Sequence, residues 1–598
     1  MKRTLALTLV IALAIAAFMS GCGASQSANQ AETKAAPTTT AAEKTTEATT
    51  KAETTKAEET TKAETTTKAT TKAAETKAAE TKAAETKAAE TQAAEVAAAG
   101  PGSVKYPLDI GQKGKITYWK GISGDLIRKE GVSSDNGTGW ADYLQEYTGL
   151  EIDFVNPAVG QEKEQFNLMI ASGDLTDIVE YGWLNGYPAG PDDAIKKGLI
   201  YDWTDKIEEW APDFLDYIRK TGELDKKFKS DGGRYWSVGF IRESGYLCVW
   251  RGPVVRADLL EQFGLERPET IDEWTTMLNT FKDNGVEFPL SIAGLGGLLN
   301  EGAFCSWGAM PGIYQVDGKA VYGPAEPGFK EVLMQLREWY ANGLLDQNFL
   351  VNDGAALNSL VGSGKVGATI GNTGGGIGAW TPVLKQNVPT GRLVAAKYPV
   401  VNKGEKPKFG QREQDFYQNY SNAVINAKSK NIEACMKLLN YGYTEAGDIF
   451  MNYGVEGKSY NWVNGIPTMT PEILLAPDNK AEWSYWARSP YSGMMIQREW
   501  YLTQLLVLPE QKEALNVWQT DRDKYNIPPV TQSVEEASEY SRIYTDVNDY
   551  YDEFCGKFII GEYPTDAFEN VFLKTLGNMG VDRMLELRQA ALDRYNMR

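Results

Sequence analysis

The stretch WRGPVVRADLLEQFGLERPETIDEW, residues 250–274, carries the clearest local signal for structure in the chain. Its end, Thr270 to Glu273, has the capping-box pattern, in which a Thr hydroxyl and a Glu carboxylate bind the free backbone N–H groups at a helix start. Beyond it, apolar residues recur at helical spacing, namely Trp274, Met277, Leu278 and Phe281. Since Gly285 lies past the last of them, the pattern predicts an amphipathic helix between Thr270 and Gly285.

Strand-like and helix-like segments alternate along the rest of the globular part. Residues 115–119 (KITYW) and 151–155 (EIDFV) are typical of strands, whereas the apolar residues before Gly173 lie at helical spacing. Such alternation predicts an α/β fold. Residues 104–598 are rich in Trp and Tyr, and this length is too great for one ordinary core, so we expect two lobes.

The N-terminus has the pattern of an export signal. Lys2 and Arg3 precede an apolar run at 5–18, which is shorter than the roughly 20 residues needed to span a bilayer. The residues MSGC at 19–22 resemble the bacterial lipobox, although its first position, here Met, is more often Leu. This resemblance implies a signal peptide at 1–21 and a lipid on Cys22, which would anchor the chain to a membrane. An ordinary signal peptide with an incidental cysteine is the alternative.

Residues 22–103 are predicted to form a disordered stalk. After Cys22 this segment consists almost entirely of Thr, Ala, Lys and Glu, and TKAAE repeats four times from Thr71. It holds almost no large apolar residues, so burial cannot offset the entropy of ordering it. As a coil it would span about 50 Å, and as a helix about 115 Å. We interpret it as a spacer that holds a globular body away from a membrane; binding of a partner by the repeat is the alternative.

The amino-acid composition excludes several kinds of catalytic and binding site. The chain has no His, which excludes Ser-His-Asp and Cys-His catalysis, His-ligated zinc and imidazole pH switches. The formal net charge is -19, and loss of Lys2 and Arg3 with the signal gives -19 - 2 = -21 for the mature chain. Such an acidic balance argues against a nucleic-acid partner, because phosphate binding needs concentrated Lys and Arg.

No metal or cofactor is predicted, and the presence of a structural calcium stays open. The cysteines beyond Cys22 form no C-x-x-C pair, and buried thiols are expected, with disulfides left open; they are Cys248, Cys305, Cys435 and Cys555. GSGKVG at 362–367 lacks the first Gly and the Ser or Thr of a P-loop. The acidic stretch 346–354 has Leu350 where a calcium loop needs an oxygen ligand.

Several segments together resemble family 1 extracellular solute-binding proteins, and in particular their large lipoprotein branch. Residues 250–274 are the best match, to an extended crossing followed by "G-L-x-x-P-x-T-x-D-E-W". ASGDLTDIVEY resembles "ASGDLPDI", with Thr176 in place of the usual Pro. The similar segments cover the chain beyond the stalk in one order: 171–181, 199–214, 250–274, 451–465, 557–562 and 580–595.

The resemblance implies a two-lobed periplasmic-binding-protein fold of type II, with a ligand cleft between the lobes. The first lobe should span 104–248, with about 416–480 returning to it, and the second lobe 249–415. Residues 481–598 should form C-terminal helices that span both lobes. In this family, closure of the lobes on a ligand is the state that the permease subunits of an ABC transporter recognise.

The branch is mostly associated with oligosaccharides, which need aromatic platforms for their C–H faces and polar side chains for their hydroxyls. By position in the family, Trp183, Trp307, Asn372 and Trp380 are the first candidates for ligand contact. Further candidates are Lys120 and Ser123, which follow the first strand, together with Trp236, Tyr485 and Trp486. For any one of these aromatic residues, a place in the core is the alternative.

We therefore expect a lipid-anchored protein at the outer face of a bacterial membrane that binds an oligosaccharide and passes it to ABC permease subunits. It should be a monomer and not an enzyme. A secreted glycoside hydrolase, which needs only two suitably spaced carboxylates, is one alternative. A surface adhesin or sensor is another, and a peptide ligand also stays open.

Overall fold

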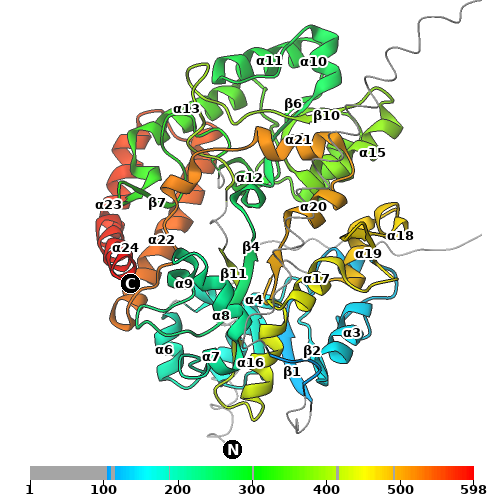
Figure 1. Cartoon of the computed structure of the whole chain (residues 1–598). Coiled ribbons are helices and arrows are strands. Elements are labelled where there is room, and N and C mark those ends of the chain that lie inside the picture. Colours follow the sequence, from blue (N-terminus) through cyan, green and yellow to red (C-terminus); the bar gives the residue numbers. More distant parts are fainter. Residues whose placement is uncertain (1–103, 109–114, 188, 300–301, 413–416, 489–491) are drawn as a thin grey trace, which may run out of the picture. The chain divides into compact units, whose positions relative to one another are not determined.

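The computed structural model describes residues 104–108, 115–187, 189–299, 302–412, 417–488 and 492–598. Within them the chain forms two lobes, each with its own sheet and its own hydrophobic core (Figure 1). The predicted α/β fold with two lobes is therefore confirmed. The predicted signal peptide, Cys22 and the stalk lie outside the described residues. In the described part, no helix is both long and apolar enough to cross a membrane.

The first lobe is built on a sheet with the strand order β14-β4-β11-β3-β1-β2. β1 is parallel to β2 and β3, whereas β11 is antiparallel to β3 and β4, so a strand from late in the chain lies inside the sheet. The strands are β1 (Ile116–Lys120), β2 (Ile152–Val155), β3 (Ile178–Tyr181), β4 (Val238–Arg242), β11 (Tyr417–Ile425) and β14 (Ile496–Gln497). Its main helices are α3 (Gly139–Thr148), α4 (Glu162–Ser172), α6 (Gly190–Lys196), α8 (Pro212–Arg219), α16 (Ile432–Tyr441), α17 (Glu445–Tyr453), α19 (Asn479–Trp486) and α20 (Glu499–Leu505).

The second lobe is built on a sheet with the order β10-β5-β9-β6. Its strands are β5 (Arg251–Arg256), β6 (Phe288–Leu290), β9 (Val366–Asn372) and β10 (Leu393–Ala395), and a hairpin of β7 (Ile313–Val316) and β8 (Lys319–Tyr322) is added. The helices are α10 (Ala257–Phe263), α11 (Ile271–Asp283), α12 (Gly294–Leu299), α13 (Pro327–Ala341), α14 (Gly354–Gly362), the π-helical turn η4 (Thr373–Gly378), α15 (Ala379–Asn387) and α21 (Pro509–Val517).

Helix α11 confirms the prediction from the capping box. The Thr270 hydroxyl accepts a hydrogen bond from the Glu273 N–H at 3.1 Å, and the Glu273 carboxylate accepts one from the Thr270 N–H at 3.2 Å. The predicted apolar face is buried in the core of the second lobe, since Trp274, Met277, Leu278 and Phe281 are all inaccessible to solvent. The local pattern therefore fixes both the start of this helix and the face that it buries.

Hydrogen bonds and ion pairs tie together the segments that link the lobes. The chain passes to the second lobe between β4 and β5, returns between β10 and β11, and passes again after α20. Buried Gln411 joins the first two passages: its Nε2 donates to the Cys248 carbonyl at 3.1 Å, and its Oε1 accepts from the Trp250 N–H at 2.8 Å. Arg498, which directly precedes α20, forms an ion pair at 3.0 Å with Glu243, at the start of the first passage.

The C-terminal helices contact both lobes. α22 (Val534–Ile559) contacts α13 of the second lobe and α6 of the first (Figure 1). α23 (Lys574–Met579) and α24 (Val581–Asn596) follow it. From α24, the Arg594 Nε donates to Asp231 of the first lobe at 2.9 Å, and Gln589 donates to the Gly318 carbonyl of the β7–β8 hairpin at 3.0 Å.

The expected buried thiols are also confirmed. Cys248, Cys305, Cys435 and Cys555 are cysteines with buried side chains. Burial raises the pKa of the Cys305 thiol to about 12 and raises that of Cys435 and Cys555 as well. A thiol that is both buried and fully protonated reacts poorly, because the thiolate is the nucleophile.

We predict that these thiols are inert in the folded protein. In a Cys22→Ser variant at neutral pH, a thiol reagent should label essentially no cysteine before unfolding and four afterwards. Spectrophotometric titration with and without denaturant measures both numbers. Rapid labelling of a thiol in the folded chain would contradict the burial described here.

Candidate functional site

Charged side chains are buried where β1 and β3 end in the first lobe. Lys120, at the end of β1, is 0% exposed, and its Nζ lies 2.8 Å from the carboxylate of Asp135. Glu180 of β3 is 4% exposed and pairs with Arg488, which is 0% exposed. Since isolated buried charges are strongly unfavourable, the two cations and two anions can stay buried only as pairs.

The Glu180 carboxylate also holds the segment that follows α19. It accepts hydrogen bonds from the Ser492 hydroxyl and, at 2.5 Å, from the Tyr118 hydroxyl. The Arg488 Nε donates to the Ser492 carbonyl at 2.8 Å. Burial alone would raise the pKa of Glu180, but the charges of Arg488 and Lys120, with the two hydroxyl donors, outweigh it and hold this pKa below its usual value. Glu180 is therefore ionised at neutral pH.

Helix α19 carries the predicted residues Tyr485 and Trp486 beside this network. A Cβ atom on Gly139 would collide with the Trp486 ring, so the ring lies directly on the start of α3. The Lys129 Nζ lies 5.1 Å from the centroid of the Tyr485 ring and 2.5 Å from Glu482 of α19. Both aromatic rings are partly exposed. They are therefore fixed in place and still able to offer surface to a ligand.

Part of the second lobe lies against the start of α19, at the opposite end of this helix from Tyr485 and Trp486. A Cβ atom on Gly374 in η4 would collide with the Lys480 Nζ, so α19 and the glycine turn TGGGIG are in contact across the lobes. The predicted Asn372, at the end of β9, directly precedes this turn and is partly exposed. The Gln511 Nε2 of α21 donates to the Thr373 carbonyl at 2.8 Å and fixes the turn on its own lobe.

Three predicted tryptophans lie in the hydrophobic cores. Trp183 and Trp236 are each 2% exposed and belong to one cluster of the first lobe, whereas Trp380 is 6% exposed in the core of the second. The Trp183 Nε1 donates to the Val179 carbonyl at 3.3 Å, and the Trp380 Nε1 donates to Asn358 at 2.6 Å. In this structure none of these rings offers an open face, and a role in ligand contact stays a prediction.

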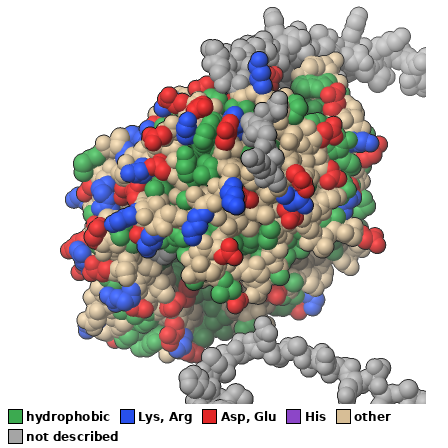
Figure 2. All heavy atoms as spheres, turned by 90° about the horizontal axis from the view of Figure 1, so that it is seen from below, with side chains coloured by type: hydrophobic (Ala, Val, Ile, Leu, Met, Phe, Trp, Pro, Cys, Tyr) green, Lys and Arg blue, Asp and Glu red, His purple; other side chains and the backbone are tan. Residues whose placement is uncertain are grey.

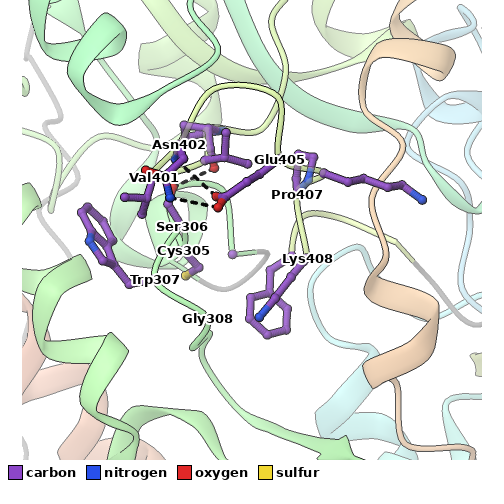
Figure 3. A pocket seen from close by; sticks show the side chains of 14 residues that line it. Cys305, Ser306, Trp307, Gly308, Val401, Asn402, Glu405, Pro407 and Lys408 are labelled. Atoms are coloured by element: carbon purple, nitrogen blue, oxygen red, sulfur yellow. Dashed lines mark hydrogen bonds between the residues drawn. The ribbon is translucent and has the colours of Figure 1, made fainter.

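Ser123 and Trp307 occupy two further environments. Ser123 is buried after β1, and its hydroxyl accepts a hydrogen bond from the Asp125 N–H at 3.1 Å, which stabilises the turn. Trp307 lines a pocket whose described walls all belong to the second lobe (Figure 3). The structure thus places Tyr485 and Trp486 on α19, whose start contacts the turn that follows Asn372. Lys120 lies in the buried ion-pair network, and Trp307 lies elsewhere, in the second lobe.

Other residues near the contact of the lobes could not have been identified from the sequence. Lys480 and Arg488 lie in α19 and just after it, without a recognisable motif. Trp250 starts the second lobe, and its buried Nε1 has no hydrogen-bond partner among the described residues. A buried donor without a partner is unfavourable, which makes this indole a candidate for contact with a ligand.

The described part contains no group of three or more Cys, Asp or Glu side chains that could hold a metal ion. Figure 2 shows acidic and basic side chains intermixed over the face that it presents.

Comparison with known proteins matches this chain to one family. The model of the family described as "Bacterial extracellular solute-binding protein" matches residues 130–449. Lipoprotein LipO of Bacillus subtilis (strain 168) is 24% identical over 343 residues, which are 54% of this chain and 64% of LipO, so the chain spans less than two thirds of that relative. The fructooligosaccharide ABC transporter substrate-binding protein FusA of Streptococcus pneumoniae is 23% identical, covering 76% of this chain and 86% of FusA.

Solved structures share the fold. That of S. pneumoniae FusA with kestose has a TM-score of 0.64 at 21% identity and covers 81% of this chain and 100% of FusA. The alginate-binding protein AlgQ2 without calcium has a TM-score of 0.63 at 23% identity, covering 80% of this chain and 97% of AlgQ2. Both belong to the type II architecture predicted from the sequence.

The buried ion pair between Glu180 and Arg488 should make the stability of the fold depend on pH. A carboxylate whose pKa is lower in the folded than in the unfolded chain stabilises the fold above its ordinary pKa of about 4.5. That stability is lost as the pH falls through the lower, folded pKa. Glu180→Gln should lower the free energy of unfolding at pH 7 by about 3–5 kcal/mol, because it leaves Arg488 buried without its partner.

Urea unfolding at pH 7 and at pH 3–4 measures this difference. The difference in the free energy of unfolding between wild type and Glu180→Gln should be smaller at pH 3–4 than at pH 7. Glu569→Gln, which removes an exposed partner of Lys330, is the matched control and should change stability little at either pH. An equal and small effect of both substitutions would contradict a buried, ionised Glu180.

Proposed function

Because this chain belongs to the bacterial extracellular solute-binding protein family, we propose that it captures an oligosaccharide between its lobes and delivers it to an ABC importer. The observation that carries this proposal is the contact between α19 and the glycine turn η4. It brings Lys480 of the first lobe to the turn that follows Asn372 at the end of β9, and Tyr485 and Trp486 lie at the other end of the same short helix. A solute held there would touch both lobes at once.

The chemistry on the two sides of the junction suits a sugar. Tyr485 and Trp486 supply aromatic surface for C–H faces, while Lys480 and Asn372 can bind hydroxyls. The names of the relatives support the same class: FusA is described as a fructooligosaccharide-binding protein, and YtcQ of B. subtilis as a polygalacturonan/rhamnogalacturonan-binding protein. These relatives are binding proteins, which supports a role without catalysis. A peptide ligand is the other outcome that the first experiment below can give.

We also propose that Cys22 carries the lipid and that residues 22–103 act as the spacer. The lipobox-like MSGC and the name of LipO, a lipoprotein, support the anchor. The permease subunits would then meet a monomeric body, 104–598, at the outer face of the membrane. The limits of the lobes, 104–248 and 249–415, are part of the same proposal.

Thermal unfolding of the purified protein against a panel of oligosaccharides tests the proposed ligand class. A ligand at about 100 times its Kd should add about 2.7 kcal/mol to the free energy of unfolding. We expect a shift with one class of oligosaccharide and no new product by chromatography. A shift with peptides alone would overturn the ligand class, and release of a hydrolysis product would favour a hydrolase.

Substitution of Trp486 tests the place of the site. Loss of an aromatic contact of about 0.5–1.5 kcal/mol should weaken binding of the shifting oligosaccharide about twofold to tenfold in Trp486→Ala. Trp462→Ala is the matched control, since this ring is 45% exposed on the strand 460–463 of the first lobe. Calorimetry gives both affinities, and the melting temperature without ligand shows that both variants fold. If Trp486→Ala binds the oligosaccharide as tightly as Trp462→Ala does, the site lies elsewhere.

A further inference from the structure

A pocket with a volume of 530 Å³ lies between two loops of the second lobe, at 302–308 and 399–409 (Figure 3). We call it the loop pocket. All of its described lining residues belong to these two loops, and none of them is part of the first lobe. Its volume falls within the roughly 300–1,000 Å³ that small-molecule sites occupy. It is therefore separate from the junction of α19 and η4, which involves both lobes.

Hydrogen bonds hold the walls of the loop pocket in place. The Ser306 hydroxyl donates to the Pro399 carbonyl at 2.7 Å and so joins the two loops. The Asp521 N–H donates to the Pro407 carbonyl at 2.9 Å, and Lys406 pairs with the Asp521 carboxylate. Walls that are already fixed lose little freedom when a ligand binds.

Three side chains of the loop pocket offer groups to a ligand. The Glu405 carboxylate accepts hydrogen bonds from the Asn402 N–H at 3.2 Å and from the Asn402 Nδ2 at 2.9 Å, and both lower the pKa of Glu405. Among the described residues, neither the Lys408 ammonium group nor the Trp307 indole N–H has a hydrogen-bond partner, and the Trp307 ring is partly exposed. One aromatic face, one anchored carboxylate and one ammonium group thus border the same cavity.

We propose that the loop pocket is a second saccharide site, which takes one or two sugar units. The C–H face of a sugar stacks on Trp307, its hydroxyls donate to Glu405, and the Lys408 ammonium group donates to a ring or hydroxyl oxygen. An anion is disfavoured because Glu405 stays ionised and Lys406 is already paired. The proposal goes beyond the site between the lobes, since a glycan could bind here without contact to the first lobe. Such a site would keep a longer glycan close to the protein.

Saturation-transfer NMR on the purified full chain tests the loop pocket with methyl glycosides of glucose, galactose, N-acetylglucosamine and fructose. We expect at least one of them to bind saturably, and binding to weaken about fivefold or more in Trp307→Ala, as expected for loss of about 1 kcal/mol of aromatic contact. Glu405→Gln, at an exposed position that should not affect folding, should also weaken it. Trp462→Ala, which removes an exposed ring outside both sites, is the control and should leave this binding unchanged.

Three results would overturn the proposal. One is no saturable binding of any of these glycosides to the wild-type chain at tens of millimolar. Another is binding that survives both Trp307→Ala and Glu405→Gln. The last is saturable binding of inorganic phosphate that Lys408→Met abolishes, because it would make the loop pocket an anion site. The melting temperature of each variant shows that the comparison is made on folded protein.

Discussion

The ion pair between Glu180 and Arg488 is the constraint on which the first lobe depends. It joins β3 to a segment more than 300 residues later in the chain, and both side chains are shut off from water. Lys120 and Asp135 form a second buried pair beside it. Because such charges are stable only when paired, the late segment cannot leave β3 without a large cost in free energy. The position of α19, and with it the proposed sugar-binding face, follows from this pair.

Each lobe has its own apolar core, and apolar burial is the dominant stabilising term in folding. Between the lobes, Gln411 joins two of the passing segments by hydrogen bonds, and helix α22 contacts a helix of each lobe. A solute that touches α19 and η4 together would add a further link between the lobes.

The sequence predicted the features that depend on neighbouring residues, whereas packing against distant residues could not be read from it. The capping box at Thr270 defines α11 because all its partners lie within three residues. Trp380 follows a strand as expected, but its ring is buried because Gly371 leaves room for it against the sheet, and no local pattern reports that. The Glu180–Arg488 pair could not be predicted either, because no residue near Glu180 or Arg488 in the sequence indicates its partner.

Hydrogen exchange with and without the bound oligosaccharide tests the central claim, that one solute is held by both lobes, most directly. The account predicts that saturation with ligand slows amide exchange in residues 372–380 of the second lobe and in residues 479–486 of the first together. Protection confined to one lobe at full occupancy, or protection of neither segment, would contradict a site between them.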